Sequence, residues 1–96
     1  MRKRYLVAYD VRDDSRLRKT YKKMLGFGDF VQYSVFLCDL SHSELVIMRE
    51  ALREILNLQE DCLLIAELPW KPGKRSHKIQ VLGQRRLPDP KPCYVI

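Results

Sequence analysis

The chain has 96 residues and a net charge of +6, and 46% of its residues are hydrophobic and 31% charged. This length predicts one domain over residues 1–96 and excludes a multidomain protein, because domains usually comprise about 100 residues or more. The composition excludes disordered and fibrous proteins, and no apolar run reaches the roughly 20 residues of a membrane span, so we expect a cytoplasmic protein with no membrane partner.

The segment from Arg4 to Val11 predicts a central strand, because its side chains are apolar on both faces. Asp10 lies on the face of Leu6 and Ala8, where a carboxylate is costly unless it is paired, hydrogen-bonded or bound to a metal ion. Near a two-fold axis, Asp10 would meet its copy in a second subunit, and two facing carboxylates suit Mg²⁺. Alternatively, Asp10 caps the following helix or accepts hydrogen bonds from backbone amides.

The next residues predict an amphipathic helix that begins near Asp13 and Asp14, which we expect to cap it, and ends at Gly26. Its apolar stripe is formed by Leu17, Tyr21, Met24 and Leu25, and its outer stripe by Arg16, Lys19, Lys22 and Lys23. The helix dipole explains basic residues near the C-terminus of a helix but not those near its N-terminus. The candidate phosphate contacts here are therefore Arg12, Arg16 and Arg18, together with Lys19.

Residues 27–40 are expected to be extended, because apolar and polar side chains alternate along them. The alternation does not distinguish one kinked strand from two strands joined by a tight turn near Tyr33 and Ser34. A second helix is predicted to begin at Ser41, which can form a capping box with Glu44. Its core stripe is formed by Leu45, Met48, Leu52, Ile55 and Leu56.

A second strand that is apolar on both faces is predicted from Cys62 to Leu68. The three cysteines, Cys38, Cys62 and Cys93, are odd in number and too widely spaced for a disulfide framework or a zinc site, so we interpret them as small apolar fillers of the interior. Beyond this strand, we predict a basic turn, a short strand from Lys78 to Leu82 and a proline-rich tail. Lys74 and Arg75 of the basic turn are further candidates for nucleic-acid contacts.

Charge is unevenly distributed along the chain. Residues 1–38 carry nine basic and four acidic residues, residues 39–68 carry two and seven, and residues 69–96 carry seven and one. If the fold brings the two basic ends together, a basic surface opposes an acidic one and attracts a polyanion to one side. The alternative is a solvated surface that net charge keeps soluble.

The order strand, helix, extended pair, helix, strand predicts an α+β sandwich in which two helices cover one face of an antiparallel sheet. The other face of such a sheet is normally polar, but here the first strand and the Cys62 strand are apolar on both sides. A second copy is the simplest cover, so we predict an obligate homodimer in which residues 68–96 contact the partner subunit.

With these elements in place, the chain resembles the CRISPR-associated Cas-two (Cas2) family, small dimeric proteins of spacer acquisition in prokaryotic antiviral defence. The resemblance covers nearly the whole chain and rests on three runs: Tyr5 to Asp10 with the acids after it, Val31 to Phe36, and Lys78 to Gly83. The basic insertion from Trp70 to His77 and the proline-rich tail depart from the simplest family pattern.

The resemblance implies a ferredoxin-like βαββαβ fold with an additional C-terminal strand that exchanges onto the partner. It also implies that Asp10 of each subunit binds one Mg²⁺ across the dimer interface, with Ser34 and Phe36 next to the site. Family members are described as metal-dependent endonucleases on RNA or DNA, or as scaffolds that hold the Cas-one integrase around the DNA to be inserted.

Two hypotheses of function follow. The first is a Mg²⁺-dependent phosphodiesterase in which Asp10 is both metal ligand and catalytic residue. The second is a non-catalytic DNA-binding scaffold that bridges integrase subunits through the basic residues Arg12, Arg16, Arg18, Lys19, Lys74 and Arg75.

Overall fold

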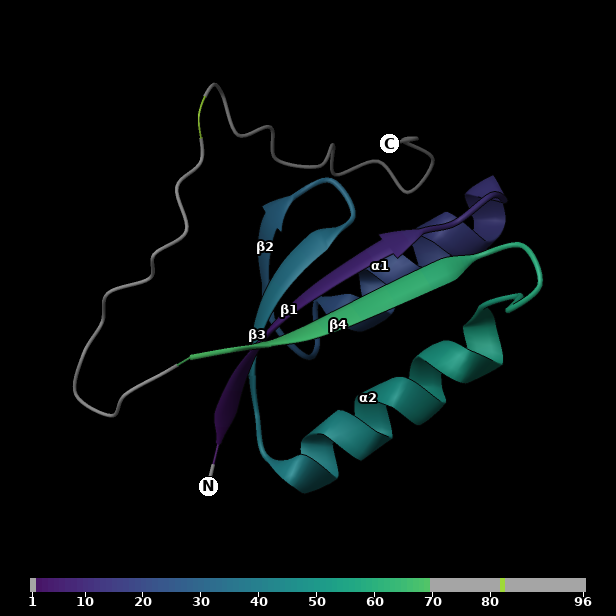
Figure 1. The fold of residues 1–96 in the computed structure, drawn as a ribbon. Helices are drawn as coiled ribbons and strands as arrows, with labels where there is room; N and C mark the ends of the chain where they lie inside the picture. The colour runs from purple at the N-terminus through teal and green to yellow at the C-terminus, as the bar shows by residue number, and fades with distance from the viewer. Residues whose placement is uncertain (1, 70–81, 83–96) are drawn as a thin grey trace.

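The computed structural model describes residues 2–69 and Leu82. The elements are β1 (Lys3–Asp10), α1 (Asp14–Met24), β2 (Asp29–Gln32), β3 (Val35–Leu40), α2 (His42–Ile55) and β4 (Cys62–Leu68), in the order drawn in Figure 1. The predicted basic turn, late strand and proline-rich tail lie outside the described residues, apart from Leu82.

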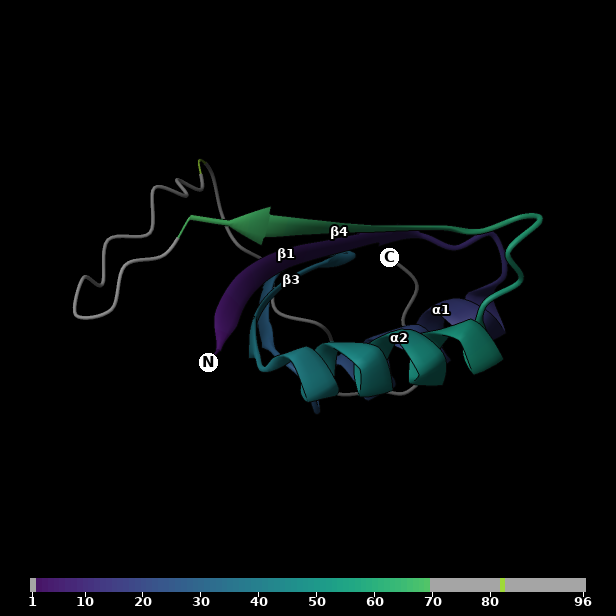
Figure 2. The same cartoon turned by 60° about the horizontal axis from the view of Figure 1, so that its bottom comes forward.

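The four strands form one sheet in the order β2-β3-β1-β4, with every neighbouring pair antiparallel. Both helices lie on the same side of this sheet, as Figure 2 shows most clearly. The βαββαβ order and the two-layer α+β architecture predicted from the sequence are therefore confirmed.

The extended segment 27–40 is a hairpin rather than one kinked strand. β2 and β3 are joined at Tyr33 and Ser34, and Ser34 has a φ of 64°. This left-handed conformation is uncommon for a residue with a side chain, and it is typical of tight turns. The turn places the carbonyl oxygen of Ser34 3.0 Å from the amide nitrogen of Tyr9, which donates to it.

The core lies between the sheet and the two helices. It is formed by Tyr5, Val7, Tyr9, Leu17, Met24, Phe36, Cys38, Leu40, Met48, Leu52 and Leu56. The predicted stripe of α1 is wrong at Leu25, which is 51% exposed, because the helix ends at Met24 and Leu25 is its C-cap. A buried position of α1 that the sequence did not suggest is Thr20, whose hydroxyl donates to the carbonyl of Arg16 at 2.8 Å.

The predicted capping box at the start of α2 is confirmed. The amide of Glu44 donates to the Ser41 hydroxyl at 3.2 Å, and the amide of Ser41 donates to the Glu44 carboxylate at 2.8 Å. The backbone hydrogen bond from Ser41 is the main cause that holds the pKa of Glu44 below its usual value. These bonds satisfy backbone donors that a helix start otherwise leaves unpaired.

The face of the sheet opposite the helices is apolar, and we call it the open face. The strand registers place on it Leu6 and Ala8 of β1, Val35 and Leu37 of β3, and Leu64 and Ala66 of β4. No element among residues 2–69 covers this face (Figure 2). The open face is therefore the uncovered apolar surface from which the sequence analysis predicted a second copy of the chain.

The two cysteines in the described strands differ. Cys38 is buried, and burial raises the pKa of its thiol to about 11. Cys62 is exposed, so its interpretation as an interior filler is wrong for the single chain. Its strand position explains the difference, because Cys62 is directly opposite Asp10 in register and shares the open face with it.

Candidate functional site

Asp10 ends β1 on the open face, with its side chain 65% exposed. Its neighbour in β4 is Cys62, and the guanidinium of Arg12 approaches its carboxylate, with Arg12 Nη2 3.5 Å from Asp10 Oδ2. The Arg12 side chain is itself 69% exposed. Both groups of this pair are thus accessible to a ligand.

Helix capping is performed by a different acid. Asp13 is the N-cap of α1, and its carboxylate accepts a hydrogen bond from the amide of Arg16 at 2.9 Å. Asp14 lies in the first turn, where the helix dipole favours an acid. The alternative in which Asp10 caps the helix is therefore not needed to explain how α1 begins.

The two residues that the resemblance placed beside Asp10 take different positions. Ser34 is held against the end of β1 by the hydrogen bond from the Tyr9 amide, one residue before Asp10. Phe36 is fully buried and pairs with Val7 in register, so it lies on the helix-covered side of the sheet. Its ring stacks on the ring of Tyr9 with centroids 6.4 Å apart, so Phe36 packs against the end of β1 on the helix-covered side of the sheet.

A second aspartate, Asp61, lies near this strand end. Its side chain is fully buried and accepts four hydrogen bonds from three segments. The donors are the amides of Arg12 and Asn57, both at 2.9 Å, and the Arg16 Nε and Nη2 atoms, at 2.8 and 3.1 Å. Arg16 also donates to exposed Glu60 at 3.0 Å.

The hydrogen bonds in this cluster shift both ionisable partners toward their charged forms. The Arg16 guanidinium is the main cause that holds the pKa of Asp61 well below its usual value, and the Asp61 carboxylate raises the pKa of Arg16. A buried carboxylate with this many donors is stable as an anion despite its desolvation.

The predicted basic residues are not brought together into one patch. Arg12 is exposed beside Asp10, whereas Arg16 is only 23% exposed and is engaged by Asp61 and Glu60. Arg18 is half-buried. Lys19 lines a hollow along the C-terminal half of α1, together with Lys22, Lys23, Gly26, Phe27 and the last residue of α2, Ile55. Lys74 and Arg75 lie outside the described residues.

Within residues 2–69, basic residues of the first third of the chain form ion pairs with acidic residues of the middle third. Besides the Asp61 cluster, Arg2 pairs with Glu44 at 2.7 Å and Arg4 with Asp39 at 2.7 Å. Much of the charge at the N-terminal end is thereby neutralised within the fold, so net charge by segment overstates the basic surface there.

The donor set for a metal ion is small in a single copy. Among residues 2–69 and Leu82, no group of three or more His, Cys, Asp or Glu side chains is arranged to hold an ion. Asp10 offers one accessible carboxylate, and Mg²⁺ commonly uses one or two carboxylates together with several waters. Asp10 therefore fits Mg²⁺ as one of these carboxylates, and a second copy would add another.

Comparison with known proteins identifies the family. Residues 2–72 match the family model described as CRISPR associated protein Cas2. The chain belongs to the CRISPR-associated Cas2 family. The family inferred from three short runs of sequence, and with it the assignment to a CRISPR function, is confirmed.

Relatives and solved structures within this family cover most of the chain. The chain is 38% identical over 91 residues to a CRISPR-associated endoribonuclease Cas2 of Thermus thermophilus, and the match covers 94% of this chain and 97% of that protein. It is 44% identical over 64 residues to an endoribonuclease Cas2 of Geobacter sulfurreducens, 67% of each protein. The crystal structure of Streptococcus pyogenes Cas2 at pH 6.5 matches with a TM-score of 0.71 and 30% identity, over 83% of this chain and 99% of that one.

Asp61 is the residue of this region that sequence reasoning missed. The sequence analysis assigned no role to the residues directly before Cys62. The available signal was an acid directly before a strand that is apolar on both faces, the same pattern that singled out Asp10 at the end of β1.

No part of the described structure offers a membrane-spanning helix, since neither α1 nor α2 is long and apolar enough.

Proposed function

We propose that this Cas2 family member works as a homodimer that cleaves phosphodiester bonds of RNA or DNA at a site built around Asp10. The observation that carries the proposal is the accessible Asp10 carboxylate on an otherwise apolar face of the sheet. A fold has no structural reason to keep such a carboxylate there unless it meets a ligand or a charge. The name endoribonuclease given to several relatives supports RNA as the first substrate to test.

Asp10 of the two subunits would hold Mg²⁺ between them. When bound, the ion stabilises the negative charge that develops on the scissile phosphate. Arg12 is close enough to pair with Asp10 in the single chain, and its exposed guanidinium can turn to a substrate phosphate when the carboxylate is engaged. The end of β1 is held in place by the Tyr9 amide, which donates to the Ser34 carbonyl, and by the Phe36 ring, which stacks on Tyr9 on the helix-covered side of the sheet.

The open face supports the proposed dimer. Leu64 is 53% exposed there, and it lies on the same face as Ala8 and Asp10. Packing two copies through this face would remove its apolar side chains from water and bring the Asp10 carboxylates toward a shared axis. Contiguous apolar surface of this kind marks an interaction site in most proteins.

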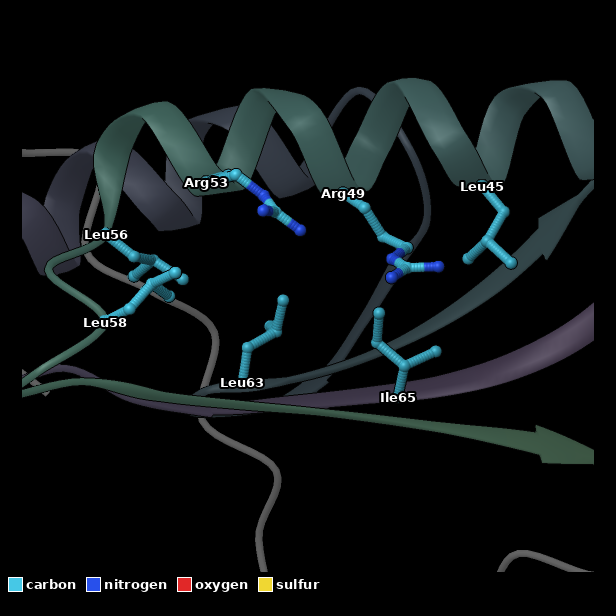
Figure 3. A pocket seen from close by; sticks show the side chains of 7 residues that line it. All are labelled: Leu45, Arg49, Arg53, Leu56, Leu58, Leu63 and Ile65. Atoms are coloured by element: carbon cyan, nitrogen blue, oxygen red, sulfur yellow. The ribbon is translucent and has the colours of Figure 1, made fainter.

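The edge of the sheet supports the proposed strand exchange. Within residues 2–69, β4 pairs only with β1, so its other edge is open to an added strand. Between this edge and α2 runs a groove lined by Leu45, Arg49, Arg53, Leu56, Leu58, Leu63 and Ile65. In Figure 3, Leu63 and Ile65 point from β4 into the groove, so alternate side chains of a strand from residues 78–82 of the partner would meet an apolar floor.

Sedimentation of two matched variants tests the dimer. Leu64→Lys should give monomers at micromolar concentration, because it places a charge in the proposed interface. Ile47→Lys should remain dimeric, since Ile47 is 59% exposed on α2, on the other side of the sheet. A wild-type chain that sediments as a folded monomer, or a dimer unchanged by Leu64→Lys, would refute the interface.

Cleavage of single-stranded RNA with Mg²⁺ by an Asp10→Ala variant tests the activity. We expect a loss of about 100-fold or more, as for removal of an essential charge-stabilising group. Asp14→Ala is the matched control, since Asp14 is an exposed acid on the next element. Full cleavage by Asp10→Ala would remove Asp10 from the mechanism.

The second candidate function is a non-catalytic DNA-binding scaffold for the integrase of spacer acquisition. Two observations in the described residues favour it: Asp10 is the one exposed carboxylate of the candidate site in each chain, and the guanidinium of Arg12 is exposed where it can contact a phosphate. Spacer integration in cells that carry Asp10→Ala distinguishes the two functions. Full integration would favour the scaffold, whereas loss of integration by a dimeric variant would favour a catalytic or metal-dependent role.

A further inference from the structure

The buried Asp61 carboxylate connects three segments where β1 ends. One oxygen, Oδ1, accepts from the amide of Arg12 in the β1–α1 connection, and both oxygens accept from Arg16 in the first turns of α1. Oδ2 also accepts from the amide of Asn57, at the start of the α2–β4 connection. The cluster thus fixes the exit of β1 against α1 and the entry of β4.

Arg12 belongs to both aspartate sites. Its backbone amide is 2.9 Å from Asp61 Oδ1, and its guanidinium Nη2 atom is 3.5 Å from Asp10 Oδ2. The backbone of Arg12 is therefore held by a buried anion, while its side chain extends to an exposed one. No other described side chain makes an ion pair with Asp10.

We infer that Asp61 is a positioning residue that acts on the Asp10 site through the backbone of Arg12. This inference rests on the proposed function, because it assumes that Arg12 and Asp10 meet the nucleic acid. Without the carboxylate, the Arg12 amide loses its acceptor and the connection after Asp10 gains conformational freedom. The Arg12 guanidinium then spends less time where substrate phosphate binds.

A double-mutant cycle separates positioning from general support of the fold. Asp61→Asn keeps the shape of the side chain but removes its charge, and it should lower kcat/KM for RNA about tenfold, the effect of weakening one charge-assisted hydrogen bond. In an Arg12→Ala background, the same substitution should change kcat/KM by less than about twofold, since the positioned group is already gone. Effects that multiply independently would refute the inference.

Glu60→Ala is the matched control. Glu60 accepts a hydrogen bond from the same Arg16 but touches neither the Arg12 nor the Asn57 amide in the described contacts. It should therefore leave kcat/KM unchanged. A loss as large as that of Asp61→Asn would show that the ion pairing of Arg16, rather than the hold on Arg12, matters.

Nuclear magnetic resonance of the native chain tests the inference without a variant. A through-hydrogen-bond coupling should be detected between the Arg12 amide nitrogen and the Asp61 carboxylate carbon, and the Arg12 amide should exchange slowly with solvent. Absence of the coupling together with fast exchange would refute positioning even if Asp61→Asn fails to fold. Unchanged cleavage in Asp10→Ala would instead overturn the proposed function, so the two failures are distinguishable.

Discussion

Two aspartate–arginine pairs lie at the same end of β1, and they differ in every physical respect. Asp10 and Arg12 are 65% and 69% exposed and 3.5 Å apart, whereas Asp61 is fully buried and Arg16 approaches it to 2.8 Å. Asp61 accepts four hydrogen bonds, while Asp10 has one loose ionic contact in the described structure. Residue type alone does not say which pair belongs to the fold and which is available to a ligand.

The two pairs differ in their exposure to water and in the number of hydrogen-bond donors that surround each carboxylate. An exposed pair is weakened by water and salt and contributes about 1 kcal/mol or less, so Asp10 can exchange Arg12 for a cation at little cost. A buried carboxylate has its lone pairs filled by fixed donors and cannot release them without leaving charges desolvated. Asp61 is therefore committed to the fold, whereas Asp10 remains accessible to a ligand.

The same substitution at the two aspartates should change the free energy of unfolding by very different amounts. Asp61→Ala should lower the free energy of unfolding by about 3 kcal/mol, because it leaves a half-buried guanidinium and two amides without their acceptor. Asp10→Ala should change it by no more than about 0.5 kcal/mol. Urea denaturation at one fixed protein concentration measures both, and equal losses would contradict the contrast.

Acid should weaken the buried pair selectively. The pKa of Asp61 is depressed in the folded chain, so the unfolded chain binds more protons and stability falls as pH drops below about 4, the ordinary value for an aspartate. The advantage of the wild type over Asp61→Asn should therefore be full near neutral pH and shrink steadily in acid. Urea midpoints measured for both chains across this range check it, and a constant difference would be inconsistent with the depressed pKa.

The salt dependence of DNA binding should separate the two arginines more finely. Arg12→Ala should reduce the slope of log affinity against log salt by about 0.9, the value for one lost phosphate contact on duplex DNA. Arg16→Gln should leave the slope unchanged, because Asp61 and Glu60 already engage this guanidinium. Titrations at several salt concentrations give both slopes, and an equal reduction would restore Arg16 as a phosphate contact.

Most of the fold could be predicted from the sequence because local signals and burial agree. The capping box of Ser41 and Glu44, the acid at Asp13 and the two-sided apolar strands each have one simple structural solution. The hairpin in residues 27–40 could not be distinguished from a single strand, because the alternation of apolar and polar residues continues through Tyr33 and Ser34. The left-handed turn position is occupied by Ser34 and not by glycine, the residue that usually indicates such a turn.

The candidate site was predictable only in part. Asp10 stood out because a carboxylate ended an apolar strand, and the structure leaves it exposed on the expected face. The role of Arg16 depends on Asp61, 45 residues further along the chain, and helical periodicity carries no information about such a partner. Long-range ion pairs of this kind decide which basic residues remain available for phosphate.

The position of Asp61 directly before Cys62 also constrains how this family member can change length. Side chains alternate between the two faces of the sheet along β4. A single residue inserted after Asp61 would therefore turn Leu63 and Ile65 toward the open face and Leu64 toward the helices. An insertion between Asn57 and Asp61 would instead break the hydrogen bonds that close this connection. Length variation is therefore expected elsewhere in the chain, and the α2–β4 connection should resist it.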